Sequence, residues 1–317
     1  MNMEQLQRPA PFDNVPLFVQ FFTLLGLFFV SLVGFTLLGL ELASVFTGST
    51  AAQLTSMGNL DNPHVVMGLK IMQIVSSFGG FIVPALIFSL LASSRRMEYL
   101  HVKSIGSMGT LLLGGLLMWC AFPLINYMGE LNSHLKLPDS MQDIQNWMKA
   151  KEDEAGTLTN AFMEHQSLKG LLLNLFMIGF LAAVAEELFF RATLQQLVIK
   201  ATGNIHAGVW LTGILFSAIH LEFFGFFPRM LMGVYLGYLF VWSKSIWVPI
   251  FAHFINNATV VFLMYLEERN LLPKKFDEIG TSNAQIGYVI ISTVVVGVLM
   301  MLIYRIEHKK KPVLPEE

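Results

Sequence analysis

The chain has 317 residues, of which 54% are hydrophobic and only 13% are charged, and its formal net charge is −2. Soluble globular domains carry about 25% charged residues, so this chain has too few charges to cover a water-exposed surface of its size. Its mean hydropathy of +0.60 predicts a polytopic membrane protein, and its pI near 6.4 excludes the basic surface that nucleic-acid binding requires.

Eight apolar stretches of about 20 residues recur along the chain, separated by polar or Gly/Pro-rich segments. They cover residues 17–40, 71–92, 109–128, 170–190, 207–223, 226–243, 247–266 and 286–304. A helix of this length crosses the hydrocarbon core of a bilayer, so we expect an all-α fold with eight transmembrane helices. Residues 1–317 then form a single multi-pass membrane domain. The one cysteine, Cys120, excludes an internal disulfide framework.

Basic residues predict an orientation for this domain, because cytoplasmic loops are enriched in lysine and arginine. They cluster after the second and eighth stretches, as Arg95, Arg96 and Lys103 and as Lys309, Lys310 and Lys311. With an even number of spans, we expect an integral protein of the cell membrane with both termini in the cytoplasm. The acidic segment 129–169 then becomes an extramembrane loop on the outer side. Lys274 and Lys275 would also lie outside, against the rule.

A glutamate pair, an arginine and two histidines fall inside the apolar stretches, all in one half of the chain. They are Glu186, Glu187, Arg191, His220 and His253. An ionisable group at membrane depth costs about 2.5–3.5 kcal/mol on insertion scales. Such residues therefore need either a partner or a function.

Helical spacing predicts that the side chains of the two glutamates point in different directions and have different roles. Glu187 and Arg191 are four residues apart and can form an ion pair on one face of a helix. Glu186 points about 100° away and stays available as a general base. The alternative is a purely structural salt-bridge cluster that locks helices together.

The histidines belong to two further elements. His253 and Asn257 share a helical face at a spacing of four residues, and His220 lies on a separate helix. Two imidazoles, a carboxylate and an amide that meet in one cavity can activate water and stabilise an oxyanion. The alternative is that each histidine is only an interhelical hydrogen-bonding residue.

The three elements together resemble the family of CAAX-protease and bacteriocin-processing (CPBP) intramembrane proteases, which includes the Ras-converting CAAX prenyl endopeptidase. The family pattern is E-E-x-x-x-R, then F-x-x-x-H, then H-x-x-x-N. Its counterparts in this sequence are Glu186, Glu187 and Arg191, then Phe216 and His220, then His253 and Asn257. The resemblance covers about 168–266, which it identifies as a four-helix catalytic core.

The resemblance implies roles for these residues. Glu186 and His220 would activate a water molecule for peptide hydrolysis, and His253 and Asn257 would form the oxyanion site. Glu187 and Arg191 would be the supporting ion pair. The family is often described as metalloproteases, and Glu186, His220 and His253 would suit Zn²⁺ with an open position for water. A metal-free mechanism uses the same residues, so zinc is possible, and we expect no obligatory cofactor.

We therefore expect an intramembrane endopeptidase, and the sequence leaves its substrate open. A prenylated or otherwise lipidated tail, a leader peptide or another membrane-embedded protein would each suit the same core, with the lipid bilayer as its surroundings. Two alternatives are a proton-coupled transporter, since buried Glu and His also mark ion pathways, and a non-catalytic immunity or scaffold protein. The absence of inverted repeats counts against transport.

Overall fold

The computed structural model describes residues 9–164, 167–272 and 279–309, and every regular element in these ranges is helical. The long helical segments are α1 (Leu17–Thr47), α3 (Pro63–Ser77), η3 (Phe78–Ile82), α4 (Val83–Ala92), α6 (Met108–Cys120), α7 (Phe122–Ser133), α8 (Gln142–Met163), α9 (Leu168–Asn174), η5 (Leu175–Leu181), α10 (Ala182–Phe189), η6 (Phe190–Gln195), α11 (Gln196–Thr202), α12 (Ile205–Ala218), α13 (Phe226–Ser243), α14 (Trp247–Glu268) and α15 (Ile286–Lys309). The short α2 (Ala51–Leu54) and α5 (Arg96–Tyr99) connect them. The all-α polytopic membrane fold is confirmed.

Each of the eight predicted stretches is mainly helical, but not all of the helical segments are long and apolar enough to cross a bilayer. Among the described residues, five continuous helical segments are long and apolar enough to cross a membrane. They cover residues 17–47, 63–92, 168–202, 247–268 and 286–309. The pair α6 and α7, bent by 42°, makes a sixth. α12 has 14 residues and is therefore about 21 Å long, against a hydrocarbon core of about 30 Å. α12 is therefore too short to cross the hydrocarbon core by itself, and the chain turns before a full crossing.

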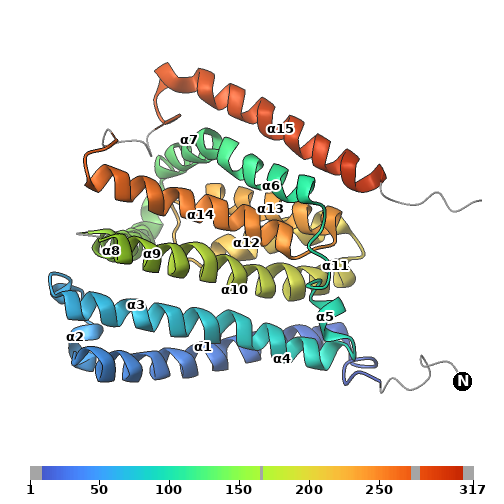
Figure 1. Cartoon of the computed structure of the whole chain (residues 1–317), viewed down its shortest axis with the longest axis horizontal. Coiled ribbons are helices and arrows are strands. Elements are labelled where there is room, and N and C mark those ends of the chain that lie inside the picture. Colours follow the sequence, from blue (N-terminus) through green and yellow to red (C-terminus); the bar gives the residue numbers. More distant parts are fainter. Residues whose placement is uncertain (1–8, 165–166, 273–278, 310–317) are drawn as a thin grey trace, which may run out of the picture.

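Most of the long helices lie side by side and run in roughly one direction (Figure 1), with α8 as an exception. α1 packs with α3 and α4 at one side of the bundle, α10 and α14 run through its centre, and α15 lies at the opposite edge. The start of α1 and the end of α15 lie at the same end of the bundle (Figure 1), as an even number of passes requires. That the shared end faces the cytoplasm stays a prediction, and Lys274 and Lys275 lie outside the described residues.

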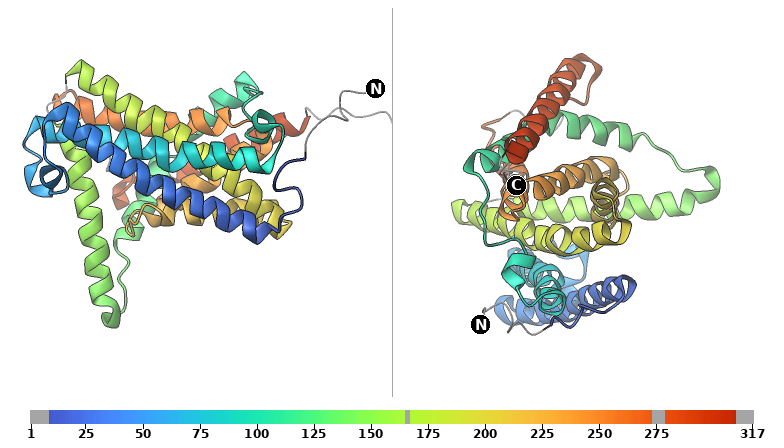
Figure 2. Two further views of the ribbon diagram at one scale, coloured as in Figure 1. Left: turned by 90° about the horizontal axis from the view of Figure 1, so that it is seen from below. Right: turned by 90° about the vertical axis from the view of Figure 1, so that its right-hand side faces the viewer.

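The segment 129–169 is more ordered than the expected loop. α7 continues to Ser133, and α8 fills most of the remainder with a helix of 22 residues. α8 runs across the direction of the bundle and extends beyond it (Figure 2). At the C-terminal end of α8, which lies against the bundle, the Phe162 carbonyl accepts hydrogen bonds from Lys70 Nζ at 2.9 Å and from Asn174 Nδ2 at 2.8 Å. These contacts fix α8 to α3 and α9.

An aromatic core supports the central helix from behind. Phe189 and Phe190, which follow the glutamate pair after Leu188, are buried against α1, η3 and α12. The ring centroids of Phe28 and Phe189 are 5.0 Å apart, and those of Phe190 and Phe216 are 5.1 Å apart. Burial of an aromatic side chain contributes about 1.5–3 kcal/mol in water, whereas in lipid the close packing itself is what favours helix association. The core thereby orients α10.

α12 and α13 form a hairpin whose axes approach closely at two glycines. A Cβ on Gly213 would lie 2.9 Å from Val234 Cγ2 and 3.2 Å from the Met230 carbonyl oxygen. A Cβ on Gly233 would lie 3.1 Å from the Gly213 Cα. Small residues at such crossings let membrane helices pack backbone to backbone. Because His220 follows α12 and the Gly233 carbonyl belongs to the candidate site, this crossing also sets the geometry of the site.

The substitution Gly213→Ala tests this approach. We expect it to destabilise the fold by about 1–3 kcal/mol, because the new methyl group meets backbone atoms that cannot move aside. The matched control is Gly26→Ala in α1, where nothing lies within 4 Å of the added Cβ. There alanine should be neutral or stabilising. Thermal unfolding of both variants in the same detergent measures the difference, and equal Tm values would contradict the interpretation.

Candidate active site

The glutamate pair lies on α10, which is the middle part of one long helical segment from Leu168 to Thr202. The π-helical turns η5 and η6 flank α10 on both sides. Such turns are rare, occur often at functional sites, and change the direction in which the following side chains point. Arg191 lies in η6 and is fully buried, so the helical irregularity and the buried guanidinium coincide.

Glu187 is the centre of a buried polar cluster. Its Oε1 lies 3.0 Å from Arg191 Nη1 and 2.9 Å from His253 Nδ1. The three side chains are at most 2% exposed. The predicted ion pair with Arg191 is therefore present, and the same carboxylate oxygen also binds His253 on α14. A buried charge without such partners would be strongly unfavourable.

Arg191 is held by α13 as well as by Glu187. Its Nη2 donates to the Gly233 carbonyl at 3.0 Å, and one helical turn later Gln195 Nε2 donates to the Gly237 carbonyl at 3.1 Å. A Cβ at Gly237 would lie 2.8 Å from Gln195 Oε1, so the glycine leaves room for this contact. The Phe216 ring lies 4.6 Å from the Arg191 Cζ, a cation–π distance. The guanidinium thus joins α10, α12 and α13.

Glu186 points in a different direction, into a cavity of about 370 Å³. Its Oε2 lies 3.9 Å from His253 Nε2, and its side chain is 16% exposed. The cavity is lined by Ile125, Glu186, Phe216, His220, Gly225, Pro228, Arg229, Met232, His253, Asn256 and Asn257. The volume is enough for several water molecules, each of which occupies about 30 Å³ in the liquid. Four of the six predicted site residues line it, while Glu187 and Arg191 form the buried cluster beside it.

The contacts of the two imidazoles indicate which nitrogen carries the proton. His220 Nδ1 lies 2.7 Å from the Phe216 carbonyl oxygen, and His253 Nδ1 lies 2.9 Å from Glu187 Oε1. Both oxygens are acceptors, so each Nδ1 carries a hydrogen. In the neutral imidazole, Nε2 is then an unprotonated acceptor. Both rings can accept a proton at Nε2.

The two asparagines on α14 differ in their contacts. Asn257 Nδ2 donates to the Ile178 carbonyl in η5 at 3.0 Å, and Asn257 Oδ1 accepts from Asn256 Nδ2 at 3.1 Å. An amide nitrogen carries two hydrogens, so each asparagine keeps one N–H for another partner. Asn256 is a cavity residue that the motif pattern did not single out.

His220 lies just beyond the end of α12, in the turn 219–225, and not inside a helix as the apolar stretch 207–223 suggested. The next residue, Leu221, has a φ of +55°, which an L-residue with a branched side chain adopts only at a cost. Two neighbouring helices hold the turn. Asn132 on α7 donates to the Phe223 carbonyl at 2.6 Å, and the Phe224 N–H donates to Glu152 on α8 at 3.0 Å. Burial raises the pKa of the Glu152 carboxyl.

Arg229 is a second cavity residue that the sequence argument missed. It lies in the first turn of α13 and forms an ion pair with Glu222 in the turn 219–225. A signal was available, because Arg229 is the one charged residue in the apolar stretch 226–243. It stands near the start of that stretch, next to Pro228, where a charge usually faces the membrane interface.

The donor set does not fit a bound metal ion. An imidazole with Nδ1 on an acceptor and Nε2 free is the form in which histidine binds metals. However, within the described ranges no three His, Cys, Asp or Glu side chains come together as ligands of one ion. Glu186, His220 and His253 line the same cavity without forming such a group. We therefore derive no step through a metal.

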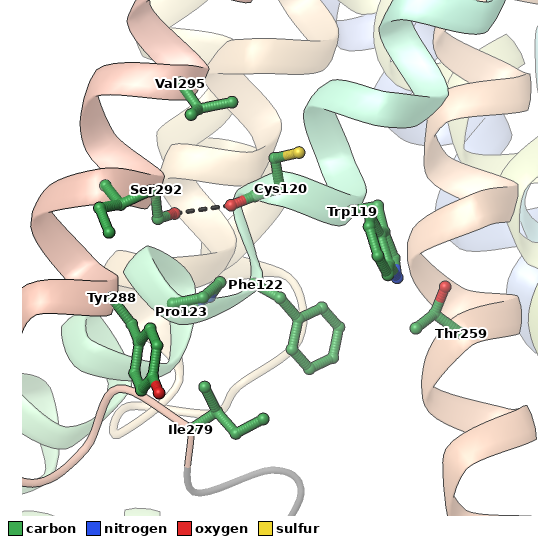
Figure 3. A pocket seen from close by; sticks show the side chains of 10 residues that line it. Trp119, Cys120, Phe122, Pro123, Thr259, Ile279, Tyr288, Ser292 and Val295 are labelled. Carbon is green, nitrogen blue, oxygen red and sulfur yellow. Dashed lines mark hydrogen bonds between the residues drawn. The ribbon is translucent and has the colours of Figure 1, made fainter. Parts of the chain in front are cut away.

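A second pocket, of about 270 Å³, lies between α6, α7, α14 and α15 (Figure 3). Its walls include Trp119, Phe122 and Tyr288, and it contains no carboxylate, histidine or basic side chain. The Ser292 hydroxyl donates to the Cys120 carbonyl at 2.6 Å beside it (Figure 3). None of the residues that the sequence analysis singled out as catalytic lines this pocket.

Comparison with known proteins agrees with the motif assignment. Residues 168–259 match the Rce1-like family, described as Type II CAAX prenyl endopeptidase Rce1-like, and this part of the chain therefore carries an Rce1-like domain. The matched residues include all six predicted site residues.

Two proteins of Bacillus subtilis (strain 168) are similar to the chain. "Uncharacterized protein YpbD" is 24% identical over 139 residues, covering 43% of this chain and 66% of that protein. "Putative membrane peptidase YdiL" is 29% identical over 92 residues, covering 29% of this chain and 37% of that protein. The alignments thus span less than two thirds of each relative's length. No solved structure matches the chain.

The buried cluster predicts different costs for removing the two neighbouring carboxylates. Glu187→Gln leaves the buried Arg191 without its counter-ion, and we expect a loss of about 3–5 kcal/mol. Glu186→Gln changes a partly exposed cavity group and should leave the fold nearly as stable as the wild type. Thermal unfolding in detergent, with both variants purified alike, measures the two effects. Equal destabilisation by the two substitutions would contradict this division.

Proposed function

We propose that this protein is an intramembrane endopeptidase that hydrolyses a peptide bond of a membrane-embedded or lipidated substrate. The observation that carries the proposal is the position of Glu186. Its carboxylate lies in a cavity with His220, with its Oε2 3.9 Å from His253 Nε2. The Rce1-like domain at 168–259 supports peptide hydrolysis as the reaction type.

In the proposed reaction, Glu186 and His220 activate one water molecule. Glu186 Oε2 lies 3.9 Å from His253 Nε2, which is too far for a direct hydrogen bond. We place the reacting water between these two atoms, because a gap of this kind suits a bridging water. Glu186 takes a proton from that water, and its oxygen attacks the carbonyl carbon of the substrate. When the C–N bond breaks, the proton passes to the leaving nitrogen. His220, with its free Nε2, is a second acceptor beside the same water.

The oxyanion formed in this step needs hydrogen-bond donors. Asn257 keeps one amide N–H for this purpose, since the other is bound to the Ile178 carbonyl. His253 can donate from Nε2 only when its ring is protonated, because its Nδ1 hydrogen is directed at Glu187. Glu187 and Arg191 hold His253 and do not themselves need to contact the substrate.

Water access and membrane depth fit together in this proposal. The turn 219–225 ends the short α12 before a full crossing, which leaves polar groups of the cavity open to solvent. Irregular backbone at membrane depth is tolerated where it lines such a polar cavity. A peptide bond reaching the cavity from the bilayer or its surface would therefore meet both the carboxylate and water.

The first activity test compares Glu186→Gln with the wild type on solubilised membrane proteins from the cells that carry this protein. Mass spectrometry of newly formed peptide termini measures cleavage. We expect Glu186→Gln to abolish the products, since the neutral amide cannot accept a proton from water. Glu98→Gln is the matched control. Glu98 lies in α5, is exposed and pairs with Lys103, so its variant should cleave normally. Identical product sets from wild type and Glu186→Gln would refute the proposal.

We further propose that hydrolysis needs no bound metal, because the cavity residues do not form a ligand group. Purified protein should then carry substoichiometric zinc by elemental analysis and should keep its activity after treatment with a chelator. One zinc per chain, with activity lost on its removal and regained on its return, would overturn this statement. Glu186 would in that case act on a metal-bound water.

A further inference from the structure

Arg229 occupies a position in the cavity that the proposed reaction does not yet use. It lies in the first turn of α13, and its side chain lines the same cavity as Glu186, His220 and His253. A permanent positive charge therefore faces the groups that would activate water.

The Arg229 guanidinium has one committed and one uncommitted nitrogen. Its Nη2 pairs with Glu222 Oε2, whereas Nη1 is buried and has no hydrogen-bond partner among the described residues. A Cβ on Gly225 would lie 3.1 Å from Nη1, so glycine at this point of the turn leaves room for the guanidinium. A buried N–H without an acceptor is unfavourable and is expected where a ligand supplies the acceptor.

The other donors of the cavity are largely occupied. His220 and His253 direct their Nδ1 hydrogens at the Phe216 carbonyl and at Glu187. In their neutral forms neither ring has a second N–H. Asn257 has given one of its two amide hydrogens to Ile178. The remaining donors are neutral amide N–H groups and the charged Arg229 Nη1, which is the strongest of them for an anion.

We propose that Arg229 Nη1 donates a hydrogen bond to the oxyanion of the tetrahedral intermediate, an inference that rests on the proposed peptidase function. As the water oxygen bonds to the carbonyl carbon, the electron pair of the C=O π bond moves onto the carbonyl oxygen. Arg229 stabilises that negative charge until the pair returns and the C–N bond breaks. Glu222 balances the guanidinium charge before substrate binds. Arg229 then acts on the reacting atoms together with the motif residues of the cavity, Glu186, His220, His253 and Asn257.

The test uses purified full-length protein and a synthetic peptide that spans a cleavage site found with the wild type but not with Glu186→Gln. We expect Arg229→Ala to lower kcat by about 100–1,000-fold, the usual cost of losing an oxyanion donor, with KM changed only a few-fold. Guanidinium chloride at low millimolar to tens of millimolar concentration should restore part of kcat to Arg229→Ala. Urea, its neutral analogue, and matched NaCl should not.

The control is Glu222→Gln, which removes the ion pair but keeps the guanidinium. If Arg229 acts on the oxyanion, Glu222→Gln keeps kcat within about tenfold of the wild type, because the cation stays available. The proposal is overturned if Arg229→Ala keeps the wild-type kcat. It is also overturned if Glu222→Gln loses as much kcat as Arg229→Ala and guanidinium restores nothing, because the pair then only supports the turn.

If Arg229→Ala shows no cooperative unfolding in detergent, the variant is not folded, and two further variants replace it in the test. Arg229→Lys keeps the charge and Arg229→Gln does not, so the lysine variant should keep at least tenfold more kcat, and equal kcat values would overturn the proposal. Failure of the peptidase proposal looks different: the wild type then yields no product that depends on Glu186. That result removes the basis for any oxyanion role of Arg229.

Discussion

One carboxylate oxygen, Glu187 Oε1, binds both Arg191 and His253 in the interior of the bundle. The attraction compensates for the cost of burying an arginine at membrane depth, and it does so only while α10, α13 and α14 keep their present positions. Arg191 extends the constraint to the Gly233 carbonyl, and Phe216 covers its guanidinium. The glycine crossing of α12 and α13 makes these short contacts possible.

The fixed geometry of Glu187 determines what its neighbour in the chain can do. Consecutive residues of a helix point about 100° apart. When Glu187 is locked into the interior, Glu186 must project to the side, where the cavity lies. Two adjacent carboxylates thus acquire separate environments: one is fully buried and neutralised by partners, and the other is partly exposed in a cavity that two imidazoles also line. Of the two interpretations of the glutamate pair, the structural salt bridge therefore describes Glu187, and the proposed general base concerns Glu186 alone.

The local part of this arrangement was predictable from sequence because helical spacing is a local property. The Glu187–Arg191 pair and the shared face of His253 and Asn257 follow from a separation of four residues. The all-α fold follows from the apolar stretches. The bond between Glu187 and His253 joins residues 66 positions apart, and no periodicity in one sequence specifies which helix face meets another. The motif pattern placed both residues in one site but not in direct contact.

Other features were hidden for different physical reasons. His220 ends in a turn because the chain leaves the helix at Ala218, although the apolar stretch continues to Phe223. The polar sequence of α8 lacks a membrane signal and therefore predicts an extramembrane loop, because hydropathy does not separate a polar helix from a loop. Arg229 lies near the start of an apolar stretch, where the sequence predicts a charge that faces the membrane interface. It faces the cavity because the turn 219–225 lies within the protein.

The central claim is that Glu186 drives the attack of water on a peptide bond, and oxygen labelling tests it most directly. Purified wild-type protein and Glu186→Gln are incubated with the same substrate peptide in H₂¹⁸O, and the new carboxyl terminus is analysed by mass spectrometry. The account predicts that the wild type forms a product carrying one ¹⁸O at that terminus and that Glu186→Gln forms none. A labelled product of equal yield from Glu186→Gln, or an unlabelled new terminus from the wild type, would contradict it.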